Sequence, residues 1–316
     1  MQRSSGLWPV DLQSDRGINF TRVLATCCTS LQTYRSFTVT APILIERNGH
    51  NTWLKWHRGR RRLSDPVFTG ERIVEAMRLG ASVEVDLVVH ADSGCAVLHD
   101  LELDRETTGR GKVRDTGAAA LRQLHLRDNQ GQPVTDRVLL LEDLCALLAE
   151  KQIHPDALLQ LDFKEDLKAL TPQLVANFGA SVAPIRSSLI LSGGDFDAIA
   201  MLAGAAPGIA IGYDPCYGES LSRLQATGDY LGFIEQALVT APDARMIYLA
   251  YDIVLAAADA GTDIIAPVHA AGRRVDAWTI NNITPETIAQ VERLLHLKVD
   301  QITTDDPEGL VEAIRQ

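Results

Sequence analysis

The sequence predicts a closed, parallel (β/α)8 barrel, and two patterns in its 316 residues support this. From about residue 53 onward, short apolar segments typical of buried strands alternate with longer segments of helical periodicity. Such alternation is typical of parallel β/α units. The strand segments number eight, which favours a closed barrel over an open doubly wound sheet. The last of them, VDQITTDD, would close the ring by pairing with the first.

The expected strands, in chain order, are Trp53–His57, Ser82–Val89, Ala157–Lys164, Ser188–Ser192, Gly208–Asp214, Met246–Tyr251, Arg274–Asn281 and Val299–Thr304. Helical periodicity is clearest in GERIVEAMRLGA, LLLEDLCALLAEK, LTPQLVANFGAS and ETIAQVERLLHL. Two regions fall outside the repeat: an N-terminal extension of residues 1–50, before a barrel of residues 51–316, and a polar insertion of about residues 100–136. Long insertions at the carboxyl end of a barrel strand are usually functional. We expect the extension either to cover the bottom of the barrel or to make a subunit contact. In the second case the protein would be a homo-oligomer.

Composition limits the partners. The chain has 41 acidic and 30 basic residues, a net charge of -11, which argues against nucleic acid or an anionic membrane as the main partner. The five cysteines have no zinc-site or CxxC spacing, so we expect reduced thiols in the cytoplasm. The N-terminus is too polar for a signal peptide, and no apolar segment is long enough for an integral membrane span. A small anionic substrate remains compatible with the charge.

Carboxylates in the predicted barrel indicate a metal site. Glu84 and Asp86 are spaced i and i+2 in SVEVDLVV, so both side chains lie on one face of the second strand. The alternative is a solvated strand face, but this strand is apolar and barrel strands have no edge. Buried carboxylates need a cationic partner, and Asp162 at the end of the third strand supplies a third ligand. Such oxygen ligands favour one Mg²⁺ or Ca²⁺ ion.

Histidines and cations accompany these carboxylates at the expected strand ends. His57 and His99 are two groups that titrate near neutral pH, as acid–base catalysis requires. Arg58 and Lys164 lie beside the predicted metal ligands, where cations bind phosphate oxygens; structural ion pairs are the alternative. The combination predicts cleavage of a phosphodiester.

The segment LKWHRGRRRL, residues 54–63, concentrates positive charge in an acidic chain. Mutual repulsion disfavours such a cluster unless an anion lies nearby. A substrate phosphate is one such anion, which makes Arg60 and Arg62 further candidates for substrate binding. A solvated loop is the other interpretation.

These motifs resemble the glycerophosphodiester phosphodiesterase family over about residues 53–316. In chain order, the motifs are HRG (57–59), GASVEVD (80–86), HDLELDRETTGRG (99–111), LDFK (161–164), WTIN (278–281) and TDDP (304–307). The resemblance implies a (β/α)8 barrel with a small insertion after its second strand. It implies metal ligands Glu84, Asp86 and Asp162, catalytic His57 and His99, and substrate-binding Arg58, Lys164 and Trp278.

Three departures from the family pattern bear on substrate and activity. The chain has PVFT (66–69) in place of the family's PENT. It has Asp162 where the family commonly has Glu, and an Asp at this position is similar to the sphingomyelinase D branch. The triple arginine after HRG is also unusual, and a related sub-branch cleaves sugar phosphodiesters of the agrocinopine type. The predicted substrate is therefore a glycerophosphodiester or a sugar phosphodiester. Cleavage through a cyclic phosphate and a non-catalytic sugar-phosphate binding protein remain the alternatives.

Overall fold

Eight parallel strands close into a ring in the computed structural model of the chain, which describes residues 43–315. In ring order they are β2 (His50–Trp56), β3 (Ser82–Val89), β7 (Leu158–Phe163), β8 (Leu189–Gly193), β9 (Ala210–Tyr213), β10 (Met246–Ala250), β11 (Arg274–Ile280) and β12 (Gln301–Thr304). The ring closes because β12 pairs with β2, from Gln301 opposite Trp53 to Thr304 opposite Trp56. All eight predicted strands are confirmed, with ends that differ by no more than three residues.

Burial on both faces explains why these strands are so apolar. Every residue of β3 is buried, although the strand carries two carboxylates. Val83, Val85 and Leu87 pack into the core between the strand and the helices, while the intervening residues lie on the opposite face, inside the barrel. The carboxylates of β3 are therefore directed into the barrel interior.

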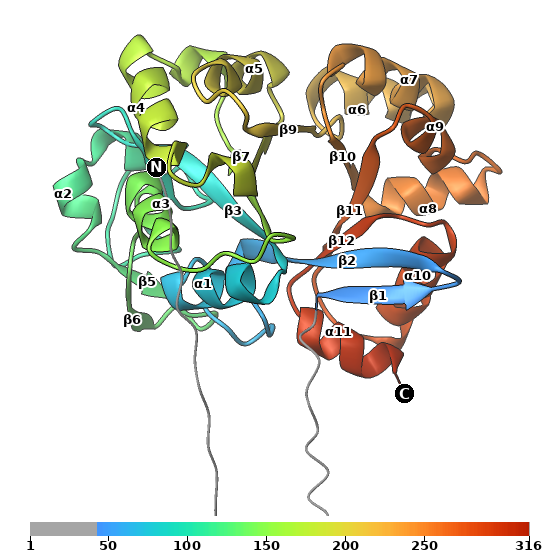
Figure 1. Cartoon of the computed structure of the whole chain (residues 1–316), viewed down its shortest axis with the longest axis horizontal. Helices are drawn as coiled ribbons and strands as arrows, with labels where there is room; N and C mark the ends of the chain where they lie inside the picture. The colour runs from blue at the N-terminus through green and yellow to red at the C-terminus, as the bar shows by residue number, and fades with distance from the viewer. Residues whose placement is uncertain (1–42, 316) are drawn as a thin grey trace, which may run out of the picture. The chain divides into compact units, whose positions relative to one another are not determined.

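Helices surround the ring of strands (Figure 1). They are α1 (Gly70–Leu79), α3 (Leu141–Ala149), α4 (Pro172–Val182), α5 (Phe196–Gly204), α6 (Gly218–Thr227), α7 (Tyr230–Thr240), α8 (Tyr251–Asp259), α9 (Ile265–Ala270), α10 (Pro285–His296) and α11 (Pro307–Ile314). The four helices predicted from periodicity, α1, α3, α4 and α10, are confirmed. Two of them begin with an N-cap threonine followed by proline: Thr171 accepts from the Leu174 N–H, and Thr284 from the Thr287 N–H.

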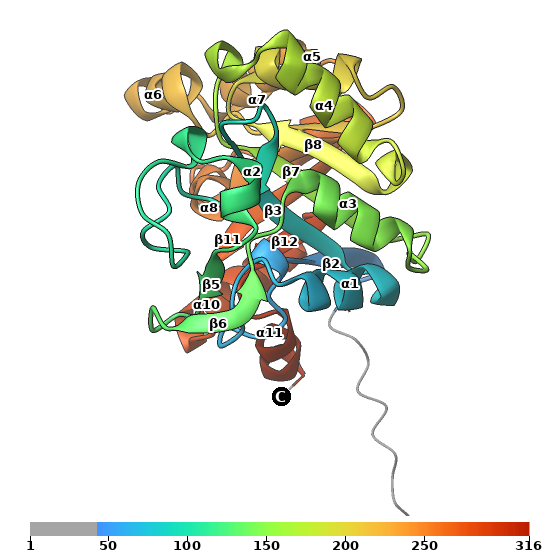
Figure 2. The same cartoon turned by 90° about the vertical axis from the view of Figure 1, so that its left-hand side faces the viewer.

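Shorter elements extend the barrel. Strand β1 (Leu44–Arg47) is antiparallel to β2, and β4 (Cys95–Val97) is antiparallel to β3. The polar insertion contains α2 (Ala118–Leu121) and the antiparallel pair of β5 (His125–Arg127) and β6 (Pro133–Arg137). In both views these three elements lie outside the ring of strands (Figures 1 and 2).

The structure covers only part of the predicted N-terminal extension. Residues 44–47 of that extension form β1, and residues 1–42 lie outside the described part of the chain. Cys95, Cys145 and Cys216 are buried free thiols, and Cys27 and Cys28 are among the residues not described. Within residues 43–315, no helix combines the length and the apolar character needed to cross a bilayer.

Candidate active site

A cavity of about 760 Å³ opens at the carboxyl ends of the barrel strands. Seven of the ten predicted site residues line it: His57, Arg58, Glu84, His99, Asp162, Lys164 and Trp278. They lie on strands β3, β7 and β11 or in the segments that follow β2, β4 and β7. Loops at this face of a parallel barrel carry the reacting groups, because the strand ends hold them at fixed positions around one opening. The other three, Asp86, Arg60 and Arg62, are not among its lining residues.

Three carboxylates converge on one side of the cavity. Glu84, Asp86 and Asp162 each place one oxygen within 4.8 Å of the others. Burial and the neighbouring Glu84 charge raise the pKa of Asp86 to about 7, although Lys164 and Arg58 act in the opposite direction. Neither Asp86 oxygen accepts a well-formed hydrogen bond from the described residues. Three hard oxygen donors this close together, two of them buried, fit a divalent cation.

Two cations compensate the carboxylates. The Lys164 Nζ is 2.6 Å from Asp86 Oδ1 and also contacts Asp162. Burial alone would lower the Lys164 pKa, but the charges of Asp162, Asp86 and Glu84 raise it, so the ammonium stays charged. The Arg58 Nε is 3.1 Å from Asp86 Oδ2, and the Arg58 backbone N–H donates to Glu84 Oε2 at 2.9 Å. Positive charge is therefore fixed at the lining of the cavity, beside the carboxylate cluster.

The glycine of the HRG motif explains how this turn forms. Arg58 and Gly59 both have positive φ, 53° and 73°, and glycine adopts this conformation without strain. A Cβ at position 59 would lie 2.9 Å from Ile73 Cγ1 of α1. The motif thus lets the chain turn sharply against α1 and directs its histidine and arginine into the cavity.

His57 is paired with a carboxylate. Its Nδ1 is 2.7 Å from Asp305 Oδ1, and its Nε2 is 3.9 Å from Glu84 Oε2. Burial would raise the Asp305 pKa, but the hydrogen bond from His57 and the nearby charges, including Arg60, lower it. Because the ionised carboxylate accepts the Nδ1 proton, Nε2 of the neutral ring carries its lone pair. Asp305 belongs to the TDDP motif, but sequence reasoning gave it no role.

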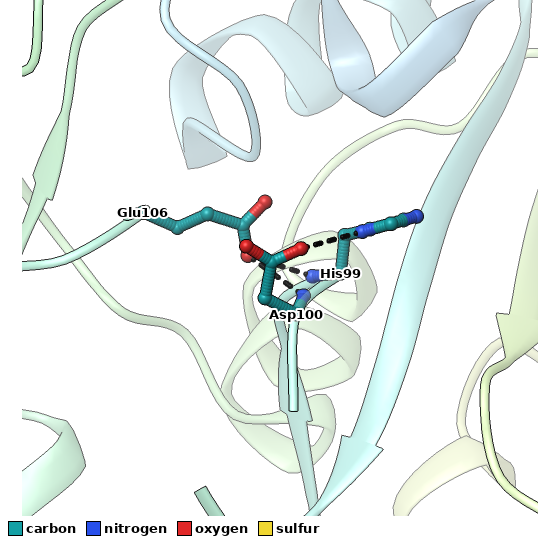
Figure 3. A group of neighbouring side chains, drawn as sticks. All are labelled: His99, Asp100 and Glu106. Atoms are coloured by element: carbon teal, nitrogen blue, oxygen red, sulfur yellow. Dashed lines mark hydrogen bonds and ion pairs between the residues drawn. The ribbon is translucent and has the colours of Figure 1, made fainter. Parts of the chain in front are cut away.

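His99 has the same arrangement (Figure 3). Its Nδ1 is 2.9 Å from Asp100 Oδ1, and Arg105 donates to both oxygens of that carboxylate. The hydrogen bond from Arg105, assisted by His99, lowers the Asp100 pKa to about 2 against the effect of burial. Glu106 Oε2 accepts the backbone N–H groups of His99 and Asp100, at 2.9 and 3.1 Å. Figure 3 shows the His99 ring directed away from Glu106.

Aromatic side chains form another part of the cavity wall. Trp278 stacks with Tyr217, with ring centroids 6.1 Å apart and an interplanar angle of 11°. Three further tyrosines line the cavity: Tyr230, Tyr248 and Tyr251. Sequence reasoning found only the tryptophan, because the tyrosines lie in segments without a recognisable motif. This wall offers ring faces and hydroxyl groups to the organic part of a ligand.

The arginine run mostly contacts the protein's own carboxylates. Arg60 Nη1 is 3.1 Å from Asp305 Oδ1, and its Nη2 donates to Asn129 at 2.7 Å. Arg62 pairs with Glu308 at 3.0 Å and with Glu312 at 2.5 Å. Neither arginine is among the residues that line the cavity. Substrate binding by Arg60 and Arg62 stays a prediction, and the contacts of Arg62 lead away from the site.

A barrel with this charge distribution at its strand ends suits enzymatic cleavage of phosphate esters. Comparison with family models agrees, because residues 57–309 match the model of the glycerophosphoryl diester phosphodiesterase family. The chain belongs to this family and is a phosphodiesterase. A search of curated protein sequences found no significant match.

Solved structures show the same fold. A putative glycerophosphoryl diester phosphodiesterase from Agrobacterium tumefaciens is 24% identical, with a TM-score of 0.61 over 84% of this chain and 97% of that chain. One from Silicibacter pomeroyi is 21% identical, with a TM-score of 0.64 over 83% and 92% of the two chains. An Oleispira antarctica phosphodiesterase in complex with the product sn-glycerol-3-phosphate is 20% identical, with a TM-score of 0.57 over 83% and 96%.

Proposed function

We propose that the protein hydrolyses a small phosphodiester, a glycerophosphodiester or a sugar phosphodiester, to an alcohol and a phosphomonoester. One observation carries the proposal: two histidines, each held at Nδ1 by a carboxylate, line the same cavity as the carboxylate cluster. This arrangement supplies both a base and an acid, as a diester with a poor leaving group requires.

The two histidines divide the proton transfers. A neutral imidazole with its Nδ1–H on a carboxylate accepts a proton at Nε2 from the attacking water. The other imidazole, protonated, donates a proton to the departing alcohol oxygen. Asp305 holds the His57 ring at Nδ1, and Asp100 holds the His99 ring in the same way, and the pKa of each carboxyl is lowered. The geometry leaves open which ring acts as the base.

Glu84, Asp86 and Asp162 would hold one divalent ion, Mg²⁺ or Ca²⁺. When bound, such an ion offsets the negative charge of the phosphate oxygens as it grows in the transition state. Arg58 and Lys164 contribute to the same offset from the protein side, since both are held at the carboxylate cluster and line the cavity.

The aromatic wall would receive the alcohol portion of the substrate. Trp278 and Tyr217 provide stacked ring faces at one side of the cavity. These ring faces would pack against the carbon atoms of a glycerol or sugar group.

A substrate panel tests the proposal. The protein is incubated with glycerophosphocholine, glycerophosphoethanolamine and a sugar–phosphate–sugar diester, each with Mg²⁺, Ca²⁺ or EDTA, and products are followed by phosphorus NMR. Chelator-sensitive release of a phosphomonoester supports hydrolysis, and the diester that is cleaved identifies the substrate. A cyclic phosphate as the end product would instead mean attack by a substrate hydroxyl. Cleavage of no diester with either ion would favour the binding-protein alternative.

A further inference from the structure

The barrel interior next to the cavity contains a buried ion pair with no part in the mechanism above. Lys55 of β2 and Asp276 of β11 are 3.1 Å apart, with side chains only 2% and 0% exposed. Thr303 donates to the second oxygen of Asp276 at 2.8 Å, and the Lys55 Nζ lies 4.3 Å from the centroid of the Tyr248 ring. A lysine so deeply buried must be fully satisfied by its neighbours to remain charged.

From Lys55 a chain of hydrogen bonds leads to the carboxylate cluster. The Lys55 ammonium donates to Gln160 Oε1. Gln160 Nε2 then donates to Ser192 Oγ at 2.8 Å, and Ser192 Oγ donates to Asp162 Oδ1 at 2.9 Å. Gln160 and Asp162 lie two residues apart on β7, so both face the interior, and Ser192 lies opposite Asp162 on β8.

The direction of every bond in this chain follows from its two ends. An ammonium group has donors only, so the Gln160 oxygen must face Lys55 and its amide nitrogen must face Ser192. The serine oxygen then accepts from the amide, and its single proton is free for Asp162. Lys55 at one end, with donors only, and the Asp162 carboxylate at the other, with acceptors only, together direct the hydroxyl proton of Ser192 toward Asp162.

We propose that Ser192 is a positioning residue for Asp162, with Lys55 and Gln160 setting the direction of its hydrogen bond. The proposal rests on the proposed function, because it takes Asp162 as a metal ligand. The bond holds Oδ1 of Asp162, and the other oxygen is turned toward Lys164, beside Asp86 and Glu84. Rotation about the last bond of an aspartate side chain is otherwise only weakly restricted. A fixed carboxylate loses less conformational freedom when it binds a cation.

Titration calorimetry, in which Mg²⁺ or Ca²⁺ is added to protein freed of metal, measures the affinity for each ion. This affinity tests the positioning role of Ser192 without an activity assay. Ser192→Ala removes the donor, and we expect 10- to 100-fold weaker binding, the usual effect of losing a hydrogen bond to a metal ligand (roughly that range in other proteins). The matched control is Thr52→Val, which removes a buried hydroxyl that donates to the Val299 carbonyl, outside the hydrogen-bond chain. Its affinity should equal that of the wild type.

Gln160→Glu tests the direction of the chain with almost no change in shape. A glutamate at this position accepts from Lys55 and gives Ser192 a second acceptor, so Asp162 no longer receives the serine proton alone. We therefore expect weaker metal binding by roughly tenfold or more. A merely structural role, or simple attraction by the added negative charge, predicts equal or tighter binding. The two explanations thus differ in sign.

The outcomes separate this proposal from the function on which it rests. If the wild type binds metal and Ser192→Ala binds it equally well, the positioning role is overturned while the metal site stands. If Gln160→Glu binds more tightly than the wild type, the directional argument is overturned. If the wild type binds neither ion, the metal part of the proposed function fails and the positioning role fails with it.

Discussion

Replacing Asp305 with asparagine should reduce catalysis only modestly, for a reason visible in the structure. In a histidine–carboxylate pair, the amide can turn its NH₂ toward Nδ1 and force the wrong tautomer, which removes the lone pair from Nε2. Here His57 Nδ1 and Arg60 Nη1 both contact the same oxygen, Asp305 Oδ1, at 2.7 and 3.1 Å. Because Arg60 has donors only, the amide oxygen of the variant should keep this place. The tautomer of His57 should be preserved.

The expected loss then reflects charge alone. A hydrogen bond to an ionised group contributes about 1.5–3 kcal/mol and a neutral one about 0.5–1.5 kcal/mol. The difference of about 1–2 kcal/mol corresponds to a decrease of about 5- to 30-fold in kcat/KM. Loss of the correct tautomer would instead cost on the order of 10⁴-fold.

The assay is kcat/KM for the diester that the substrate panel identifies, with unfolding monitored to confirm a folded variant. Arg60→Leu is measured alone and together with Asp305→Asn. Without Arg60 the amide is free to turn, so the double variant should lose far more than the product of the two single effects. A 10⁴-fold loss in Asp305→Asn alone, or multiplicative effects in the double variant, would refute this reasoning.

Three further predictions concern stability and the periphery of the site. Burial raises the pKa of Asp214 to about 8, so wild-type stability should fall between about pH 4 and 8 by up to about 1.4 kcal/mol per pH unit from this group. Asp214→Asn should remove that slope, so its free energy of unfolding should exceed that of the wild type by an increasing amount as pH rises. Urea unfolding of both proteins at pH 5 and pH 8 measures this difference, and an equal difference at the two pH values would contradict the prediction. Lys164→Met leaves Asp86 without its ammonium partner and should lower the free energy of unfolding of the metal-free protein by about 3 kcal/mol or more. Thermal unfolding with added Mg²⁺ should show part of this stability restored. Because Arg62 pairs with Glu312 outside the cavity, Arg62→Ala should change kcat/KM less than twofold and the free energy of unfolding by less than about 1 kcal/mol. A large rise in KM would instead support the predicted role of Arg62 in substrate binding.

The sequence was sufficient to predict the barrel and much of its site because both depend on short-range patterns. Strand β3 shows how: its apolar residues mark a strand buried on both faces, and the i, i+2 spacing of Glu84 and Asp86 puts both carboxylates on one face. The strand ends then bring His57, Asp162 and Lys164 together without further information.

Contacts between distant segments could not be predicted in the same way. Asp305 lies 248 residues after His57 and is its hydrogen-bond partner, a relation that requires the closure of β12 on β2. Lys55 belongs to the basic segment 54–63, yet it lies on β2 inside the barrel, paired with Asp276. Arg62, from the same cluster, is on the outside. Charge density along the chain does not distinguish these positions; the pleat of the strand and the following turn do.

The most direct test of the central claim is the rate of phosphomonoester formation from glycerophosphocholine and the sugar diester by chelator-treated protein. The rate is measured with and without Mg²⁺ or Ca²⁺, in the wild type and in His57→Gln. We expect the ion to restore cleavage of at least one diester in the wild type, and His57→Gln to lose roughly 10²- to 10⁴-fold of that rate at unchanged metal affinity. Equal rates in the two proteins, or cleavage that persists in full with the chelator present, would contradict the account.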